Sequence, residues 1–185
     1  MKFASRAGEK LEHALDTFKI DVTGKICADF GASTGGFVDC LLQHGAEKVY
    51  AVETGYGLLD WKLRNDPRVV VMERTNAMHV TLAEKVDLIS MDTSWTRIEN
   101  TIGNATANLK PDGEIIALIK PHYEASSRQL RKGKLPEDQI GEVIANVKET
   151  LLKFDVEVIA ETESPLVGSK GGNKEWLMLL RKKIF

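Results

Sequence analysis

Residues 25–37 read K-I-C-A-D-F-G-A-S-T-G-G-F, and the rest of the chain can be interpreted outward from them. The apolar run 26–28 is typical of a strand that is buried on both faces of a sheet. Three glycines follow Asp29 within seven residues, and apolar residues then recur at helical spacing until Gly45. A strand, a glycine-rich turn and a helix bring backbone N–H groups to a small ligand at the helix N-terminus. This stretch therefore predicts a cofactor site.

The spacing of the glycines and the acids around them decide which cofactor is expected. Gly31 is followed by Gly35 and Gly36, which breaks the G-x-G-x-x-G dinucleotide fingerprint, and no lysine follows to complete a phosphate-binding loop. Asp29 would repel a phosphate, but it can balance a cation such as a sulfonium or an amino group. Glu53, which ends the next apolar run, is placed to accept hydrogen bonds from the two hydroxyls of a ribose. This pattern indicates S-adenosylmethionine, and a glycine turn without a ligand is the alternative.

The residues expected to bind the cofactor lie in the glycine-rich turn and at the ends of neighbouring strands. Glycine is expected in the turn because a Cβ atom would block close approach to the ligand and disfavour a positive φ. Asn76 could hydrogen-bond an adenine edge, although an ordinary role in a loop fits it equally well. The full set is Asp29, Gly31, Ala32, Ser33, Thr34, Gly35, Gly36, Phe37, Glu53, Gly57, Asn76 and Asp92.

The composition is that of one globular domain over residues 1–185, with 43% apolar and 28% charged residues. The net charge of −2 argues against a protein that coats nucleic acid generally, but it does not exclude a local basic surface. The longest uncharged apolar run, 115–119, is far shorter than the ~20 residues of a membrane-spanning helix. The polar N-terminus shows no secretory signal, and the two cysteines have no metal or redox spacing. We therefore expect a cytoplasmic protein without a metal, and a monomer as the default state.

Apolar runs that alternate with helical patterns predict an α/β fold with a mostly parallel sheet and helices on both faces. The strands are expected at 26–28, 48–52, 69–72, 86–91, 114–119, 156–160 and 176–180, and the helices at 4–18, 35–44, 58–64, 98–109 and 140–152, with a turn at 110–113. Four strands are followed directly by a charged residue: Asp29, Glu53, Asp92 and Lys120. If the last strand runs antiparallel to its neighbour, Glu175 joins the same edge. Since ligands bind at that edge of open α/β sheets, these residues predict an active site.

Five stretches of the sequence resemble one family. They are S-R-A-G-E-K-L at 5–11, G-A-S-T-G-G-F at 31–37, G-Y-G at 55–57, R-V-V-V-M-E-R-T-N at 68–76 and L-I-K-P at 118–121. Over nearly its whole length the chain resembles the TlyA, or haemolysin A-type, family, a branch of the FtsJ-like ribose 2′-O-methyltransferases. The resemblance implies a Rossmann-like class I methyltransferase fold, S-adenosylmethionine as cofactor, and ribosomal RNA or ribosomal subunits as partners.

The resemblance also implies four catalytic residues, because FtsJ-like enzymes carry a Lys-Asp-Lys-Glu tetrad. Matched position by position, the tetrad falls on Lys10, Asp92, Lys120 and Glu175. On local sequence alone, Lys10 would be a solvated lysine of the first helix. A ribose hydroxyl is a weak acid, so we expect Lys120 to act as general base and Lys10 to steady the developing oxyanion. The two acids would orient the two lysines.

The sequence departs from the family pattern in places that leave alternatives open. Family members usually carry a small RNA-binding domain before the methyltransferase domain, and we expect residues 1–185 to form the methyltransferase domain alone. Ala7 stands where the family favours glycine. Some members are labelled haemolysins, but no membrane-spanning or pore-like segment supports that activity here. The alternative is a non-catalytic module that binds RNA or a ribosomal particle. A small-molecule methyltransferase fits less well with paired lysines, and a nicotinamide dehydrogenase fits less well with the broken fingerprint.

Basic residues gather in two expected loops close to the predicted site. They are Arg128, Arg131, Lys132 and Lys134 in the first loop, and Lys170 and Lys174 around the second. These side chains could hold RNA phosphates, and solvated loop charge is an equally good interpretation.

Overall fold

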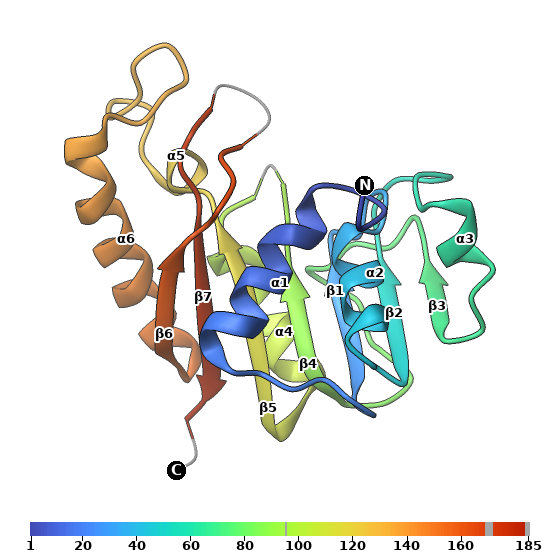
Figure 1. Cartoon of the computed structure of the whole chain (residues 1–185). Helices are drawn as coiled ribbons and strands as arrows, with labels where there is room; N and C mark the ends of the chain where they lie inside the picture. Colours follow the sequence, from blue (N-terminus) through green and yellow to red (C-terminus); the bar gives the residue numbers. More distant parts are fainter. Residues whose placement is uncertain (95, 169–171, 184–185) are drawn as a thin grey trace.

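The computed structural model describes residues 1–94, 96–168 and 172–183, and its centre is a sheet in the order β3-β2-β1-β4-β5-β7-β6 (Figure 1). The strands are β1 (Ile26–Phe30), β2 (Lys48–Val52), β3 (Val69–Met72), β4 (Val86–Met91), β5 (Leu109–Ile119), β6 (Val156–Glu163) and β7 (Trp176–Lys182). The first five pair in parallel, and β7 lies antiparallel between β5 and β6. The predicted sheet of seven mostly parallel strands with an antiparallel last strand is therefore confirmed for the described part of the chain.

Helices cover both faces of the sheet, as predicted. They are α1 (Ala7–Phe18), α2 (Gly36–Gln43), α3 (Trp61–Arg64), α4 (Glu99–Asn108), α5 (Pro121–Glu124) and α6 (Glu137–Leu151), followed by the 3-10 helix η1 (Leu152–Phe154). The apolar sides of α1 and α2 pack on one face, and those of α4 and α6 pack on the other (Figure 1). Side chains alternate across β1, so Cys27 faces α1 and α2 while Ala28 and Phe30 face α4 and α6. Asp29 therefore belongs to the α1 and α2 side.

Several sequence predictions about element limits are corrected. The turn expected at 110–113 lies inside β5, because Leu109 pairs with Val86 and Glu114 pairs with Leu88. The four residues between them bulge opposite Asp87, whose carboxylate holds Lys110 at 2.7 Å. The helix expected over 4–18 begins only at Ala7.

The carboxyl ends of the parallel strands meet at one edge, which gathers the charged residues. Phe30 pairs with both Val52 and Met91, and the Asp92 N–H donates to the Phe30 carbonyl at 3.0 Å. On the antiparallel side, Ile119 pairs with Trp176, so Lys120 and Glu175 occupy the next positions along the same edge. Asp29 was expected directly after its strand, but β1 continues to Phe30, so Asp29 is the second-last residue of the strand.

Candidate active site

The glycine-rich turn after β1 packs tightly against neighbouring backbone. The N–H groups of Gly31 and Ala32 both donate to the Val52 carbonyl, at 2.9 and 3.0 Å. Gly31 has a φ of +95°, and a Cβ atom there would lie 2.4 Å from the carbonyl oxygen of Asp92. A Cβ atom on Gly36 would lie 2.2 Å from the Ser5 Oγ. Gly31 and Gly36 are therefore needed for close packing, but the close contacts are with other parts of the chain and not with a ligand.

Replacing Gly31 with alanine should lower the free energy of unfolding by about 2–4 kcal/mol, since positive φ and overlap with the Asp92 carbonyl act together. Gly57→Ala is the matched control, because Gly57 also has a positive φ, +71°, but has open space around its Cβ position. That variant should cost about 1 kcal/mol from the backbone conformation alone. Urea unfolding of both variants measures the difference, and equal losses would contradict a steric role for Gly31.

A cavity of about 500 Å³ opens above this turn, within the range of small-molecule sites. Ten of the predicted cofactor residues line it: Asp29, Gly31, Ala32, Ser33, Thr34, Gly36, Phe37, Glu53, Asn76 and Asp92. Gly35 and Gly57 do not line it. Gly35 packs against Leu63 of α3, and the Gly57 N–H donates to the Glu73 carboxylate at 2.8 Å.

Asp29 is the most deeply buried acid of the cavity wall, with 1% of its surface exposed. The Ser90 hydroxyl donates to its Oδ1 at 2.8 Å, while no group of the described residues hydrogen-bonds its Oδ2. Burial raises the pKa of Asp29 to about 8; the bond from Ser90 opposes this, and the negative charges of Asp92 and Glu53 add to it. The site therefore offers a buried acceptor that a cation would stabilise as a carboxylate.

Glu53 holds two loops together at the end of β2. Its Oε2 accepts from the Ser33 N–H and its Oε1 from the Gly55 N–H, both at 2.8 Å. The Thr54 hydroxyl also donates to Oε1, at 3.1 Å, so it is Oε2 that keeps a second acceptor site for a ligand hydroxyl. Asn76 has an ordinary role in its loop, where its Oδ1 accepts from the Met78 N–H at 2.9 Å. It also lines the cavity, and its contact with an adenine edge stays a prediction.

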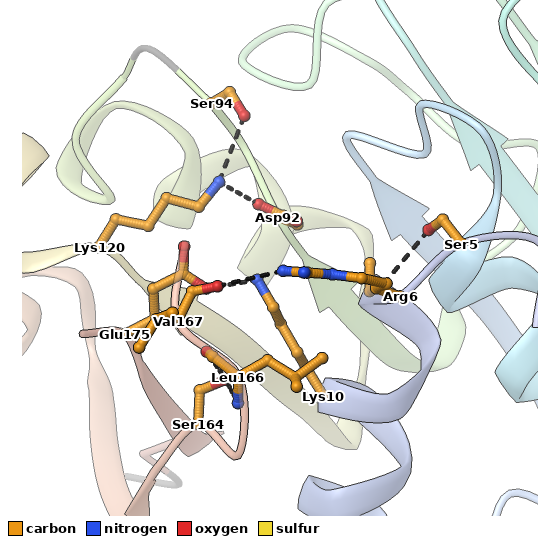
Figure 2. A network of polar contacts seen from close by, with 11 residues as sticks. Ser5, Arg6, Lys10, Asp92, Ser94, Lys120, Ser164, Leu166, Val167 and Glu175 are labelled. Carbon is orange, nitrogen blue, oxygen red and sulfur yellow. Dashed lines mark hydrogen bonds and ion pairs between the residues drawn. The ribbon is translucent and has the colours of Figure 1, made fainter. Parts of the chain in front are cut away.

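Two lysine–carboxylate pairs stand at the sheet edge beside the cavity (Figure 2). Lys10 of α1 pairs with Glu175, and both side chains are almost fully buried, 9% and 3% exposed. Lys120 pairs with Asp92 and donates to the Ser94 hydroxyl at 3.3 Å, and its ammonium lies 5.8 Å from the Tyr123 ring centroid. The predicted tetrad residues therefore form two ion pairs.

Pairing lowers the free-energy cost of placing these charges in a largely buried site. A lone charge of this kind would cost several kcal/mol, whereas a paired and hydrogen-bonded one costs much less. Asp92 and Ser94 also line the cavity, so Lys120 is connected to it through both of its partners. Lys10 is buried because α1 lies along the sheet beside β6 and β7, which corrects the solvated position that its local sequence suggested.

Several residues of the site were not expected from the sequence. Ser90 is a polar residue within the apolar strand β4, and its register opposite Asp29 is the signal that could have identified it. Ser94 lies two residues after Asp92, and no sequence pattern identifies it as a residue of the site. Arg6 donates to the Val167 carbonyl at 3.4 Å beside the Lys10 pair (Figure 2). Further unpredicted residues line the cavity: Ser5, Ala7, Thr75, Ala77, Met78 and Thr96.

The sheet order, with β7 antiparallel, together with the acid-flanked glycine turn, defines the fold of class I S-adenosylmethionine-dependent methyltransferases. The sequence matches the FtsJ-like methyltransferase family over residues 3–182, and the chain belongs to that family. Within the part of the chain that the structure describes, no helix is long and apolar enough to span a membrane.

Individual relatives place the chain in the TlyA and hemolysin A branch. It is 41% identical to Hemolysin A of Brachyspira hyodysenteriae, over 96% of this chain and 76% of that protein. It is 38% identical to the 16S/23S rRNA (cytidine-2'-O)-methyltransferase TlyA of Mycobacterium tuberculosis, over 97% of this chain and 68% of that protein. The solved structure of a Streptococcus thermophilus protein with a provisional hemolysin name superposes with a TM-score of 0.95 at 36% identity, covering 99% of this chain and 68% of that one.

Proposed function

We propose that the chain transfers a methyl group from S-adenosylmethionine to a ribose 2′-hydroxyl of ribosomal RNA. The observation that carries this proposal is the pair of lysine–carboxylate contacts beside the cavity, Lys10 with Glu175 and Lys120 with Asp92, because two positioned lysines suit the removal of a proton from a ribose hydroxyl and the stabilisation of the resulting oxyanion. The name of the Mycobacterium tuberculosis relative supports the same reaction and substrate class.

The residues around the cavity fit this cofactor. Asp29 presents an acceptor without a partner among the described residues, in a place where a cation is favoured. Glu53 retains acceptor capacity for ribose hydroxyls, and Asn76 lines the same cavity with its amide. The cofactor supplies an electrophilic methyl group carried on a cationic sulfur.

The four charged residues have separate roles in the reaction. Lys120 acts as a neutral amine: it takes the proton of the ribose hydroxyl as that oxygen becomes a nucleophile, and it becomes the ammonium that pairs with Asp92. Release of that proton to solvent restores the base. Asp92 accepts an N–H of Lys120 and so fixes the direction in which the amine points. Lys10, held by Glu175, stabilises the negative charge that develops on the oxygen. Fixing these groups on strand ends and on one helix holds the nucleophile in place, which lowers the entropic barrier.

Incubation with S-adenosylmethionine labelled in its methyl group tests the proposal. Label is expected in ribosomal RNA, offered either naked or as assembled subunits. The modified ribose should resist alkaline cleavage, because that cleavage requires a free 2′-hydroxyl. Cofactor binding by calorimetry without transfer to either form of RNA would instead support the non-catalytic binding module.

A further inference from the structure

Residues 126–134, here called the basic hairpin loop, connect α5 to α6 and present four exposed cations: Arg128, Arg131, Lys132 and Lys134. At the tip, the Arg131 N–H donates to the Lys134 carbonyl at 2.8 Å, and the Lys134 N–H returns a bond of 3.0 Å. Lys132 and Gly133 between them have φ values of +52° and +77°, as in the tight two-residue turn of a β-hairpin. The three tip cations are therefore presented by a defined turn.

The loop is attached to the protein at several points. Leu130 packs against the apolar core, and the flanking residues Ala125 and Leu135 are buried in it. Within the loop, the Ser126 N–H donates to the Gln129 Oε1 at 2.9 Å. These contacts fix where the cations stand, so a ligand would not have to order the whole segment on binding.

The attachment points put the loop beside the proposed catalytic residues. Asn173 lies two residues before Glu175; its Oδ1 is 3.3 Å from the Leu135 N–H nitrogen and its Nδ2 is 3.5 Å from the Gly133 carbonyl oxygen. The preceding helix α5 begins directly after Lys120. In Figure 1 the orange loop that leads into α6 extends beyond the edge of the sheet where β5 ends.

Among the described residues, the four cations of the basic hairpin loop form no ion pair with an acid. No carboxylate of the described residues lies within 4.0 Å of any of them, whereas Lys174, expected to act with them, is held by Glu137 at 3.5 Å and Glu163 at 3.6 Å. Lys170 lies outside the described residues. On a chain of net charge −2, this leaves a local positive surface next to the site. Such a surface attracts polyanions and binds phosphates irrespective of base sequence.

We propose that the basic hairpin loop binds the phosphate backbone of the RNA next to the nucleotide that is methylated. This inference rests on the proposed function and specifies how its substrate is held. Counterions released from the phosphates would supply the binding free energy, so affinity must fall with salt in proportion to the number of contacts.

The double variant Lys132→Gln and Lys134→Gln tests this with a short single-stranded RNA as the probe. Fluorescence anisotropy at several salt concentrations gives the slope of log affinity against log salt. Removing two phosphate contacts should make that slope shallower by about 1.4 and weaken binding at low salt by about tenfold or more. The matched control is Lys19→Gln with Lys153→Gln. Both lysines are exposed: Lys19 directly follows α1, and Lys153 lies in η1 just before β6. Lys19 has a positive φ of +58°, which matches the φ of +52° at Lys132.

The control should keep the wild-type slope, and both variants should bind S-adenosylmethionine with wild-type affinity. Equal slopes in the two double variants would overturn the hairpin proposal while leaving the proposed function intact if RNA is still methylated. A wild-type protein that binds the cofactor but neither binds nor methylates RNA would contradict the proposed function itself.

Discussion

Replacing Lys120 with alanine should reduce methyl transfer by about 10²- to 10⁴-fold, the usual contribution of a general base. Cofactor affinity should stay within a few-fold of wild type, because Lys120 does not line the large cavity. Methyl incorporation into RNA and cofactor affinity are to be measured on one preparation of protein.

A second substitution at the same position separates proton transfer from charge. Lys120→Arg keeps a cation that can pair with Asp92, but a guanidinium stays protonated and cannot accept the proton. If Lys120 is the base, the arginine variant should be as inactive as the alanine variant. Activity retained by arginine would mean that only the positive charge matters, and the assignment of the base would then be wrong.

Lys110 offers a matched control on the same two strands. It pairs with Asp87 at the opposite end of β4 and β5, at 2.7 Å, as Lys120 pairs with Asp92 at the active edge. Lys110→Ala removes an ion pair of the same kind far from the cavity. It should change stability slightly, by less than about 1 kcal/mol for so exposed a pair, and leave the specific activity unchanged.

Asp29→Asn should have two opposite effects, weaker cofactor binding and greater stability at alkaline pH. The carboxylate is the acceptor that favours a cation in the cavity, so its loss should weaken S-adenosylmethionine binding by about tenfold or more. S-adenosylhomocysteine lacks the sulfonium charge but keeps the amino group. A smaller loss for it would assign the Asp29 contact to the sulfonium, and an equal loss would assign it to the amino group.

The stability effect follows from the direction of the pKa shift. The pKa of Asp29 is about 8 in the folded protein against an ordinary 3.8, so the folded state holds a proton that the unfolded state has released. Between these two values, the free energy of unfolding of the wild type falls by up to about 1.4 kcal/mol for each unit of rising pH. The total loss is on the order of a few kcal/mol. Asparagine does not titrate, so the free energy of unfolding of the cofactor-free variant does not fall in this way.

Urea unfolding between pH 5 and 9 measures the difference in stability between Asp29→Asn and wild type. That difference should grow with pH and level off above about pH 8. Asp87→Asn is the control: burial works against the shift, but the bonds from Lys110 and the Ile26 N–H hold the pKa of Asp87 below its ordinary value of 3.8. Asp87 is therefore ionised in both the folded and the unfolded state between pH 5 and 9, and the difference in stability between this variant and wild type should not change with pH. A difference for Asp29→Asn that stays constant with pH would mean that Asp29 is ionised in the folded state.

The parts of the fold that follow from local patterns could be read from the sequence. The apolar run of β1, its glycine turn and the helical repeat of α2 are contiguous, and their combination specifies a strand–turn–helix unit. Turn chemistry at 110–113 misled the prediction, because strand pairing on both sides of those residues absorbs them as a bulge in β5. Hydrogen bonds to a neighbouring strand outweighed the local preference.

The sequence by itself determined which edge of the sheet carries the charged residues, because parallel strands that end in Glu53, Asp92 and Lys120 must bring their ends together. Only the tertiary structure decided how the charges are used. Lys10 and Glu175 are 165 residues apart, and nothing local shows that α1 buries one against the other. Burial also raises the pKa of Asp29 to about 8 and leaves its Oδ2 without a hydrogen-bond partner among the described residues. Pairing and desolvation depend on neighbours that are distant in the chain, so these properties arise only when the sheet and its helices have assembled.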